Sequence, residues 1–204
     1  GHSVLDNEIA QSTEYGMEFG KTANLTITGN TIFGSGRAGI AIDHELETEI
    51  NYNLTISGCT VHNNSKKGSC FGGISLMNVP GAKVFNNTFR DLDDALKLQK
   101  NCGGLLIFNN SFDNCSDAIT LKSSGVTIHN NTITKCFSGI RQDDPSSWDN
   151  LIENNNITHG GCYGIYVTGK NQTLRGNRIS DGENPYSGIY IDQNGYANIS
   201  FNEI

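Results

Sequence analysis

Residues 116–144 read SDAITLKSSGVTIHNNTITKCFSGIRQDD, and two short phrases within this stretch recur along the whole chain. The first phrase is an asparagine, any residue and an apolar residue, as in Asn131-Thr132-Ile133. It returns every 21 to 29 residues, and one copy has Cys59 in the asparagine position. Recurrence at such a period is typical of repeat architectures. The asparagines of the phrase are Asn7, Asn30, Asn87, Asn110, Asn131, Asn155, Asn177 and Asn202.

The second phrase begins with a small residue and continues with alternating apolar positions, as in Ala118-Ile119-Thr120-Leu121. This alternation predicts a short strand with one buried face. Short strands that are separated by turns and recur with the first phrase, without helical periodicity, predict an all-β, right-handed parallel β-helix. We expect about eight to nine turns in a single domain over residues 1–204, since each repeat supplies one turn.

The pattern of phrases resembles the repeats called NosD-like, or carbohydrate-binding-and-sugar-hydrolase repeats, over nearly the whole chain. The resemblance implies the β-helix fold. It does not select a function, because the family includes enzymes, binding modules and surface proteins.

The repeated asparagines predict a structural ladder inside the β-helix. Strands of successive turns lie about 4.8 Å apart, so each side-chain amide can hydrogen-bond the next one. Cys59 is expected to fill its position as a small buried thiol. Cys115 and Cys136 stand at equivalent places in neighbouring turns, where either a disulfide or two free stacked thiols would fit.

The composition narrows the classes of partner and compartment. A net charge of −7 argues against a nucleic-acid partner, and no apolar run approaches the length of a membrane span. Six cysteines without a C-x-x-C pair favour an oxidising, extracellular or cell-surface setting over a zinc site. Sequons add candidates for N-glycosylation in such a setting. These candidates are Asn24, Asn53, Asn86, Asn109, Asn130 and Asn171.

The second phrase also predicts which side chains face outward. Stacking the repeats places charged residues beside tyrosines on one sheet face. Cations neutralise the carboxylates of acidic sugars and tyrosines stack on sugar rings, so this face is a candidate for binding an acidic glycan. The candidate residues are Asp94, Lys97, Asp117, Tyr163, Tyr166 and Tyr190.

The stretch CSDAITLKSS resembles the active-site strand of the alginate lyase and chondroitinase B family. The resemblance implies Asp117 as a calcium ligand, Lys122 as the base and Arg141 as the acid of a uronate lyase. The chain departs from that family at Cys115, which stands where the family has its first acid. Gln142 replaces the apolar residue of the other repeats beside Arg141, and this local exception favours a functional role. Apart from this calcium, no cofactor is expected.

Three functions remain open at this point. Neither end of the chain resembles a cap, which favours a structural cell-surface protein that self-associates end to end into a filament or layer, or an excerpt of a longer protein. The alternatives are a polysaccharide lyase or epimerase-like enzyme, and a glycan-binding module without chemistry. The stretch AIDHE, with Asp43, His44 and Glu45, is faintly similar to the Asp-Pro-His-Glu motif of mannuronan C5-epimerases, although its proline is missing.

Overall fold

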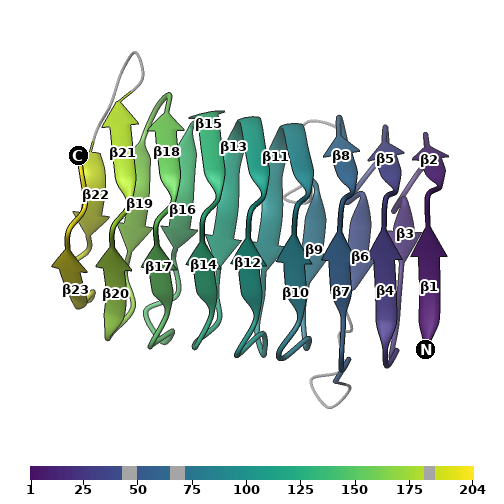
Figure 1. Cartoon of the computed structure of the whole chain (residues 1–204), viewed down its shortest axis with the longest axis horizontal. Helices are drawn as coiled ribbons and strands as arrows, with labels where there is room; N and C mark the ends of the chain where they lie inside the picture. The colour runs from purple at the N-terminus through teal and green to yellow at the C-terminus, as the bar shows by residue number, and fades with distance from the viewer. Residues whose placement is uncertain (43–49, 65–71, 182–186) are drawn as a thin grey trace.

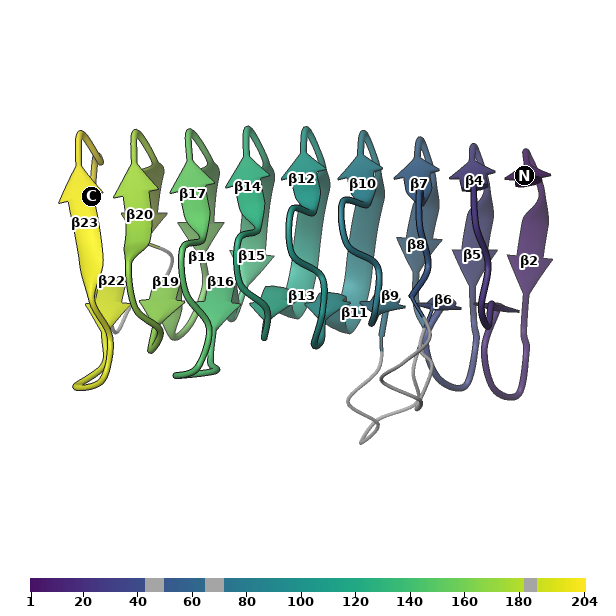
Figure 2. The same ribbon diagram turned by 90° about the horizontal axis from the view of Figure 1, so that it is seen from below.

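The computed structural model describes residues 1–42, 50–64, 72–181 and 187–204. In this part of the chain every regular element is a strand, and every strand pair is parallel. The chain forms a β-solenoid that starts at one end and finishes at the other, as Figure 1 shows. Each complete turn contributes strands to three long walls, which are seen from below in Figure 2.

Wall 1 is a nine-stranded sheet, and its strands pair in sequence order from turn to turn. Its strands are β1 (His2–Leu5), β4 (Leu25–Thr28), β7 (Thr55–Ser57), β10 (Lys83–Phe85), β12 (Leu106–Phe108), β14 (Thr127–His129), β17 (Leu151–Glu153), β20 (Gln172–Arg175) and β23 (Ala197–Ser200).

Walls 2 and 3 belong to one bent sheet. Wall 2 consists of β2 (Glu8–Ala10), β5 (Thr31–Phe33), β8 (Thr60–His62), the first halves of β11 (Thr88–Leu98) and β13 (Ser111–Leu121), β15 (Thr132–Cys136), β18 (Asn156–His159) and β21 (Arg178–Asp181). Wall 3 consists of β3 (Met17–Glu18), β6 (Ile40–Ile42), β9 (Ile74–Leu76), the second halves of β11 and β13, β16 (Ser138–Gln142), β19 (Tyr163–Val167) and β22 (Ser187–Ile191).

The core consists of columns of apolar side chains, one from each wall position. In wall 2, for example, Phe89 of β11 pairs in register with Phe112 of β13, and Phe112 pairs with Ile133 of β15. The rings of Phe89 and Phe112 are stacked with centroids 4.7 Å apart. All three side chains are fully buried. Repetition of one apolar position in each turn is therefore what closes the solenoid around a continuous core.

The expected asparagine ladder is present between walls 1 and 2. The side-chain nitrogen of Asn110 donates to Oδ1 of Asn131 at 3.0 Å, and equivalent bonds join the successive asparagines from Asn87 to Asn202. Cys59 is a buried thiol at one position of the ladder. It interrupts the ladder because it offers Nδ2 of Asn30 a sulfur at 4.0 Å in place of an amide oxygen. The ladder satisfies polar groups that the turn would otherwise bury without partners.

The residue before each ladder asparagine adopts a left-handed backbone conformation. Asn86, Asn109 and Asn130 have φ values of 56°, 55° and 56°. Asparagine tolerates this conformation better than most residues, so the repeated Asn-Asn pair has two separate structural causes. All six candidate glycosylation asparagines are exposed, and their glycosylation stays a prediction.

Candidate functional site

The outer face of wall 3 brings together side chains that are far apart in the sequence. Lys97, Thr120, Arg141, Tyr166 and Tyr190 occupy equivalent positions on five consecutive turns. Along the solenoid, the residue type in this column changes from cationic and polar to aromatic. The face therefore has two parts, which we call the charged strip and the tyrosine cluster.

The charged strip comprises Asp94, Lys97, Asp117, Arg141 and Asp143. Nζ of Lys97 lies 3.3 Å from Oδ2 of Asp94. Nη1 of Arg141 lies 3.2 Å from Oδ2 of Asp117, and its Nε lies 3.8 Å from Oδ2 of Asp143. Each cation of the strip is thus matched by at least one carboxylate. The strip is a network of opposite charges rather than a cationic surface.

Burial affects the protonation of the strip. Partial burial raises the pKa of the Asp94 carboxyl, the nearby Lys97 ammonium lowers it, and the net direction is upward. Burial acts to lower the pKa of Arg141, but the carboxylates of Asp117 and Asp143 outweigh this effect and the pKa is raised. Arg141 is therefore a fixed cation, because a guanidinium does not release its proton in this setting.

The tyrosine cluster comprises Tyr163, Tyr166 and Tyr190. The rings of Tyr166 and Tyr190 are parallel with centroids 5.5 Å apart, and Tyr163 tilts against both at 5.2 and 5.1 Å. Tyr190 is 39% exposed, and the other two rings are half-buried. A hydrogen bond with Cys162 raises the pKa of Tyr163, and burial raises that of Tyr166. These phenols accordingly stay neutral hydrogen-bonding groups near pH 7.

The structure does not place Lys122 in one cavity with Arg141. Lys122 is exposed and lines a groove of about 400 Å³ beside Asp144 and the half-exposed Trp148, and Arg141 does not line that groove. Among residues 1–42, 50–64, 72–181 and 187–204, no group of three His, Cys, Asp or Glu side chains suits a metal ion. Asp117 forms an ion pair with Arg141, and its expected role as a calcium ligand stays a prediction.

Gln142 has a structural explanation rather than the functional one that its position favoured. Its side chain points inward and is fully buried, in the column between Leu121 and Val167. Its Oε1 accepts hydrogen bonds from the backbone N–H groups of Thr168 at 2.9 Å and Gly169 at 2.6 Å. The N–H of Thr168 also donates to the backbone carbonyl of Gln142 at 3.1 Å. The side-chain amide therefore matters most for the N–H of Gly169, whose bond to it a leucine would remove.

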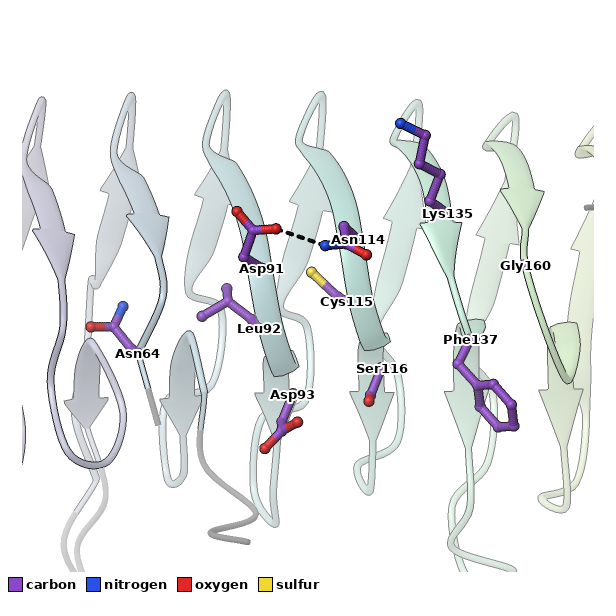
Figure 3. A pocket seen from close by; sticks show the side chains of 10 residues that line it. All are labelled: Asn64, Asp91, Leu92, Asp93, Asn114, Cys115, Ser116, Lys135, Phe137 and Gly160. Carbon is purple, nitrogen blue, oxygen red and sulfur yellow. Dashed lines mark hydrogen bonds between the residues drawn. The ribbon is translucent and has the colours of Figure 1, made fainter. Parts of the chain in front are cut away.

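A groove that the sequence did not reveal follows the bend between walls 2 and 3 (Figure 3). This bend groove has a volume of about 500 Å³ and crosses successive turns of the solenoid. Leu92 and Cys115 are nearly buried at its base. Asn114 donates to Oδ1 of Asp91 at 2.7 Å on one side. The remaining lining residues are Asn64, Asp93, Ser116, Lys135, Phe137 and Gly160.

Cys115 and Cys136 stack beneath this groove, as the equivalence of their positions predicts. The residues on either side of them pair in register, Asp113 with Thr134 and Asp117 with Ser138. Both are separate, buried thiols in the structure, so the alternative of a disulfide is not the state observed. A hydrogen bond with Cys136, together with burial, raises the pKa of the Cys115 thiol.

Residues 46–171 match the family model described as periplasmic copper-binding protein (NosD), and residues 1–71 match the right handed beta helix region. The chain belongs to the NosD family. The family description names copper, but the described residues of this NosD-family chain contain no group of three or more His, Cys, Asp or Glu side chains that could hold a metal ion. No curated protein matches the sequence.

Solved structures share the fold of this NosD-family chain at low identity. PfbA, a surface adhesin of Streptococcus pneumoniae, is 13% identical with a TM-score of 0.73, and the match covers 98% of this chain and 58% of PfbA. The tailspike protein of E. coli bacteriophage HK620, solved with a pentasaccharide, is 10% identical with a TM-score of 0.62. That match covers 93% of this chain and 45% of the tailspike. DFA-IIIase from Arthrobacter chlorophenolicus A6 is 14% identical with a TM-score of 0.54, and the match covers 96% of this chain and 50% of that enzyme. This chain thus spans about half the length of these proteins.

The Asp43, His44 and Glu45 motif lies outside the described residues. Among those residues no helix is long and apolar enough to cross a membrane.

Proposed function

We propose that this NosD-family chain is a glycan-binding module that performs no chemistry on its ligand. The observation that carries the proposal is the tyrosine cluster, in which Tyr166 and Tyr190 present parallel rings on the open outer face of wall 3. Tyrosine combines an apolar ring face with a polar hydroxyl, which suits a ligand whose own rings have apolar faces and polar edges.

The rigidity of wall 3 supports this role. Tyr166 and Tyr190 are in register on adjacent strands, and the backbone ladder fixes their spacing before any ligand arrives. A binding group that is already ordered loses little conformational entropy on binding. The charged strip lies on the same face and offers carboxylates and a guanidinium as hydrogen-bonding partners for hydroxyl groups.

The same geometry does not favour the lyase alternative. The lyase mechanism needs Arg141 to donate a proton, yet two carboxylates hold it as a cation and raise its pKa. Lys122, the base in that mechanism, is exposed beside a different groove. Binding without bond cleavage is therefore the function that these side chains support best.

We also propose that the protein works outside the cytoplasm, at the cell surface or in the envelope. Support comes from the word periplasmic in the family description and from the surface adhesin among the structural neighbours. Fractionation of the source cells tests the proposal, and a signal only in the cytoplasmic fraction would overturn it. Self-association into a filament stays a prediction.

Affinity electrophoresis through gels containing soluble polysaccharides tests the glycan-binding proposal. We expect the wild-type chain to be retarded by at least one polysaccharide and the Tyr166→Ala variant to be retarded less. Tyr52→Ala is the matched control, because Tyr52 is 55% exposed and lies on the turn before β7, well away from wall 3's tyrosines. Equal retardation of both variants would contradict the assignment of the site.

A further inference from the structure

The bend groove runs along the axis of the solenoid, across the strands. Its lining residues come from five consecutive turns, beginning at Asn64 and ending at Gly160. Four steps between turns correspond to a length of about 19 Å, given the spacing of neighbouring strands. A site of this shape suits an extended chain better than a single compact molecule.

Phe137 lies at the end of the groove, and the neighbouring turn holds its ring in place. Its side chain is 56% exposed, although it is a large apolar group. The ring lies against Gly161 of the next turn, where an added Cβ would be only 2.2 Å from Cδ2 of Phe137. Gly161 therefore leaves space that the ring occupies. The result is an aromatic surface that is positioned by the backbone and open to solvent (Figure 3).

The groove leads directly to the tyrosine cluster. The N–H of Cys162 donates to the carbonyl oxygen of Phe137 at 2.6 Å, so these residues occupy adjacent turns. Tyr163 follows Cys162 and is the first ring of the cluster. On the preceding turns Asp93 and Ser116 line the groove immediately before Asp94 and Asp117 of the charged strip. The groove and the outer face of wall 3 are thus neighbouring parts of one surface.

The charges of this surface select the class of ligand. Lys97 and Arg141 are matched by carboxylates of the strip. In the groove Asp91 lies 3.9 Å from Nη1 of Arg90, Asp93 adds negative charge, and Lys135 adds one positive charge. The whole chain has a net charge of −7. A polyanion would meet repulsion here, since no excess of cations neutralises its carboxylates.

We infer that the bend groove and the tyrosine cluster form one extended site for an uncharged oligosaccharide that lies along the solenoid axis. The inference rests on the proposed function and names its ligand class. It replaces the acidic glycan expected from the sequence, because Lys97 and Arg141 form ion pairs with carboxylates of the same face. Phe137 is the central contact, between hydrogen-bonding groups of the groove and the tyrosine rings.

Isothermal titration calorimetry tests the inference with defined probes. The probes are the uncharged series cellobiose and cellohexaose, maltose and maltohexaose, and mannobiose and mannohexaose, with hexagalacturonate as the acidic comparator. We expect an uncharged hexasaccharide to bind more tightly than its disaccharide and than hexagalacturonate. Phe137→Ala should weaken hexasaccharide binding about five-fold, in the range that one aromatic contact provides.

Three variants separate the possible outcomes. Gly161→Ala should weaken hexasaccharide binding as Phe137→Ala does, because it displaces the ring without removing it, whereas Tyr52→Ala should change nothing. Unchanged hexasaccharide affinity in Phe137→Ala, together with a loss in Tyr166→Ala, would overturn the extended site and leave the proposed function intact. Tighter binding of hexagalacturonate would overturn the ligand class. Absence of binding to every probe would overturn both, provided that circular dichroism shows the wild-type chain to be folded.

Discussion

Arg141 on β16 and Asp117 on β13 form an ion pair across neighbouring turns, with Nη1 and Oδ2 3.2 Å apart. Asp143 lies on the other side of the same guanidinium at 3.8 Å. Two carboxylates thus hold one cation that would otherwise attract acidic ligands. This arrangement explains how a face rich in arginine, lysine and tyrosine is still unsuited to polyanions.

Neutralising Asp117 should change the ligand preference of wall 3. In Asp117→Asn the guanidinium of Arg141 loses its shorter ion pair, and we expect hexagalacturonate to bind more tightly by about three- to ten-fold, in line with about 1 kcal/mol for a partly exposed charge pair. Calorimetry at low and high salt measures this gain, which should shrink as salt screens the charge. Asp149→Asn removes one charge outside the strip and serves as the control. An equal gain in both variants would point to net charge alone.

The asparagine ladder should contribute strongly to stability. In Asn110→Ala the side chains of Asn87 and Asn131 each lose a hydrogen-bond partner. The backbone N–H of Asn87 and the backbone carbonyl of Val84 also lose the bonds that they form with the Asn110 side chain. We expect the free energy of unfolding to fall by about 3 kcal/mol, because buried polar groups without partners are costly. Urea unfolding measures the change. Asn156→Ala, at an exposed strand position, should cost less than about 1 kcal/mol.

Restoring asparagine at the interruption of the ladder should stabilise the chain. Cys59 offers Asn30 only a sulfur at 4.0 Å, whereas an asparagine there would offer an oxygen, as in the neighbouring turns. We expect Cys59→Asn to raise the free energy of unfolding by about 1 kcal/mol, the usual net contribution of one hydrogen bond. Cys59→Ala, measured alongside, should lower it. A destabilised Cys59→Asn variant would show that this turn is too narrow for the larger side chain.

The raised pKa of Asp94 predicts a pH dependence of stability with a defined sign. Burial raises the carboxyl pKa in the folded chain above its unfolded value, so the folded state binds the proton more tightly. The contribution of Asp94 to the free energy of unfolding is therefore full at pH below its unfolded pKa and declines as pH rises through the folded pKa. Unfolding of wild type and Asp94→Asn between pH 3 and pH 7 measures it, as the difference between the two curves. The stability of the wild type relative to the variant should fall with rising pH; a relative rise would contradict the prediction.

The repeat made the fold predictable, because each phrase reports one position of one wall. The ladder from Asn87 to Asn202 followed directly, since equivalent positions in a solenoid become neighbours in space. The same reasoning placed Tyr166 beside Tyr190 and Asp117 near Arg141. Such reasoning predicts which residues are neighbours, but not which side chains pair with one another. The ion pairs of the charged strip were therefore visible only in the structure.

The bend groove was not predictable for a physical reason. Its rim depends on the backbone at Asp91, Asn114 and Lys135, which share a left-handed conformation with φ values of 56°, 54° and 53°. Three different residue types adopt that conformation, so no phrase in the sequence marks it. Gln142 was misinterpreted for a related reason. The pattern showed that a polar residue replaces an apolar one, but it did not show the turn whose backbone N–H groups donate to the Gln142 side chain.

Mapping of backbone amide chemical shifts during titration with an uncharged hexasaccharide tests the central claim most directly. The claim is that a glycan binds along the outer face of wall 3. We predict that the largest shifts fall on Tyr166, Tyr190 and Phe137 and extend to the residues of the bend groove, while the amides of wall 1 stay unchanged. Saturable shifts confined to wall 1, or no shift with any oligosaccharide, would contradict the claim.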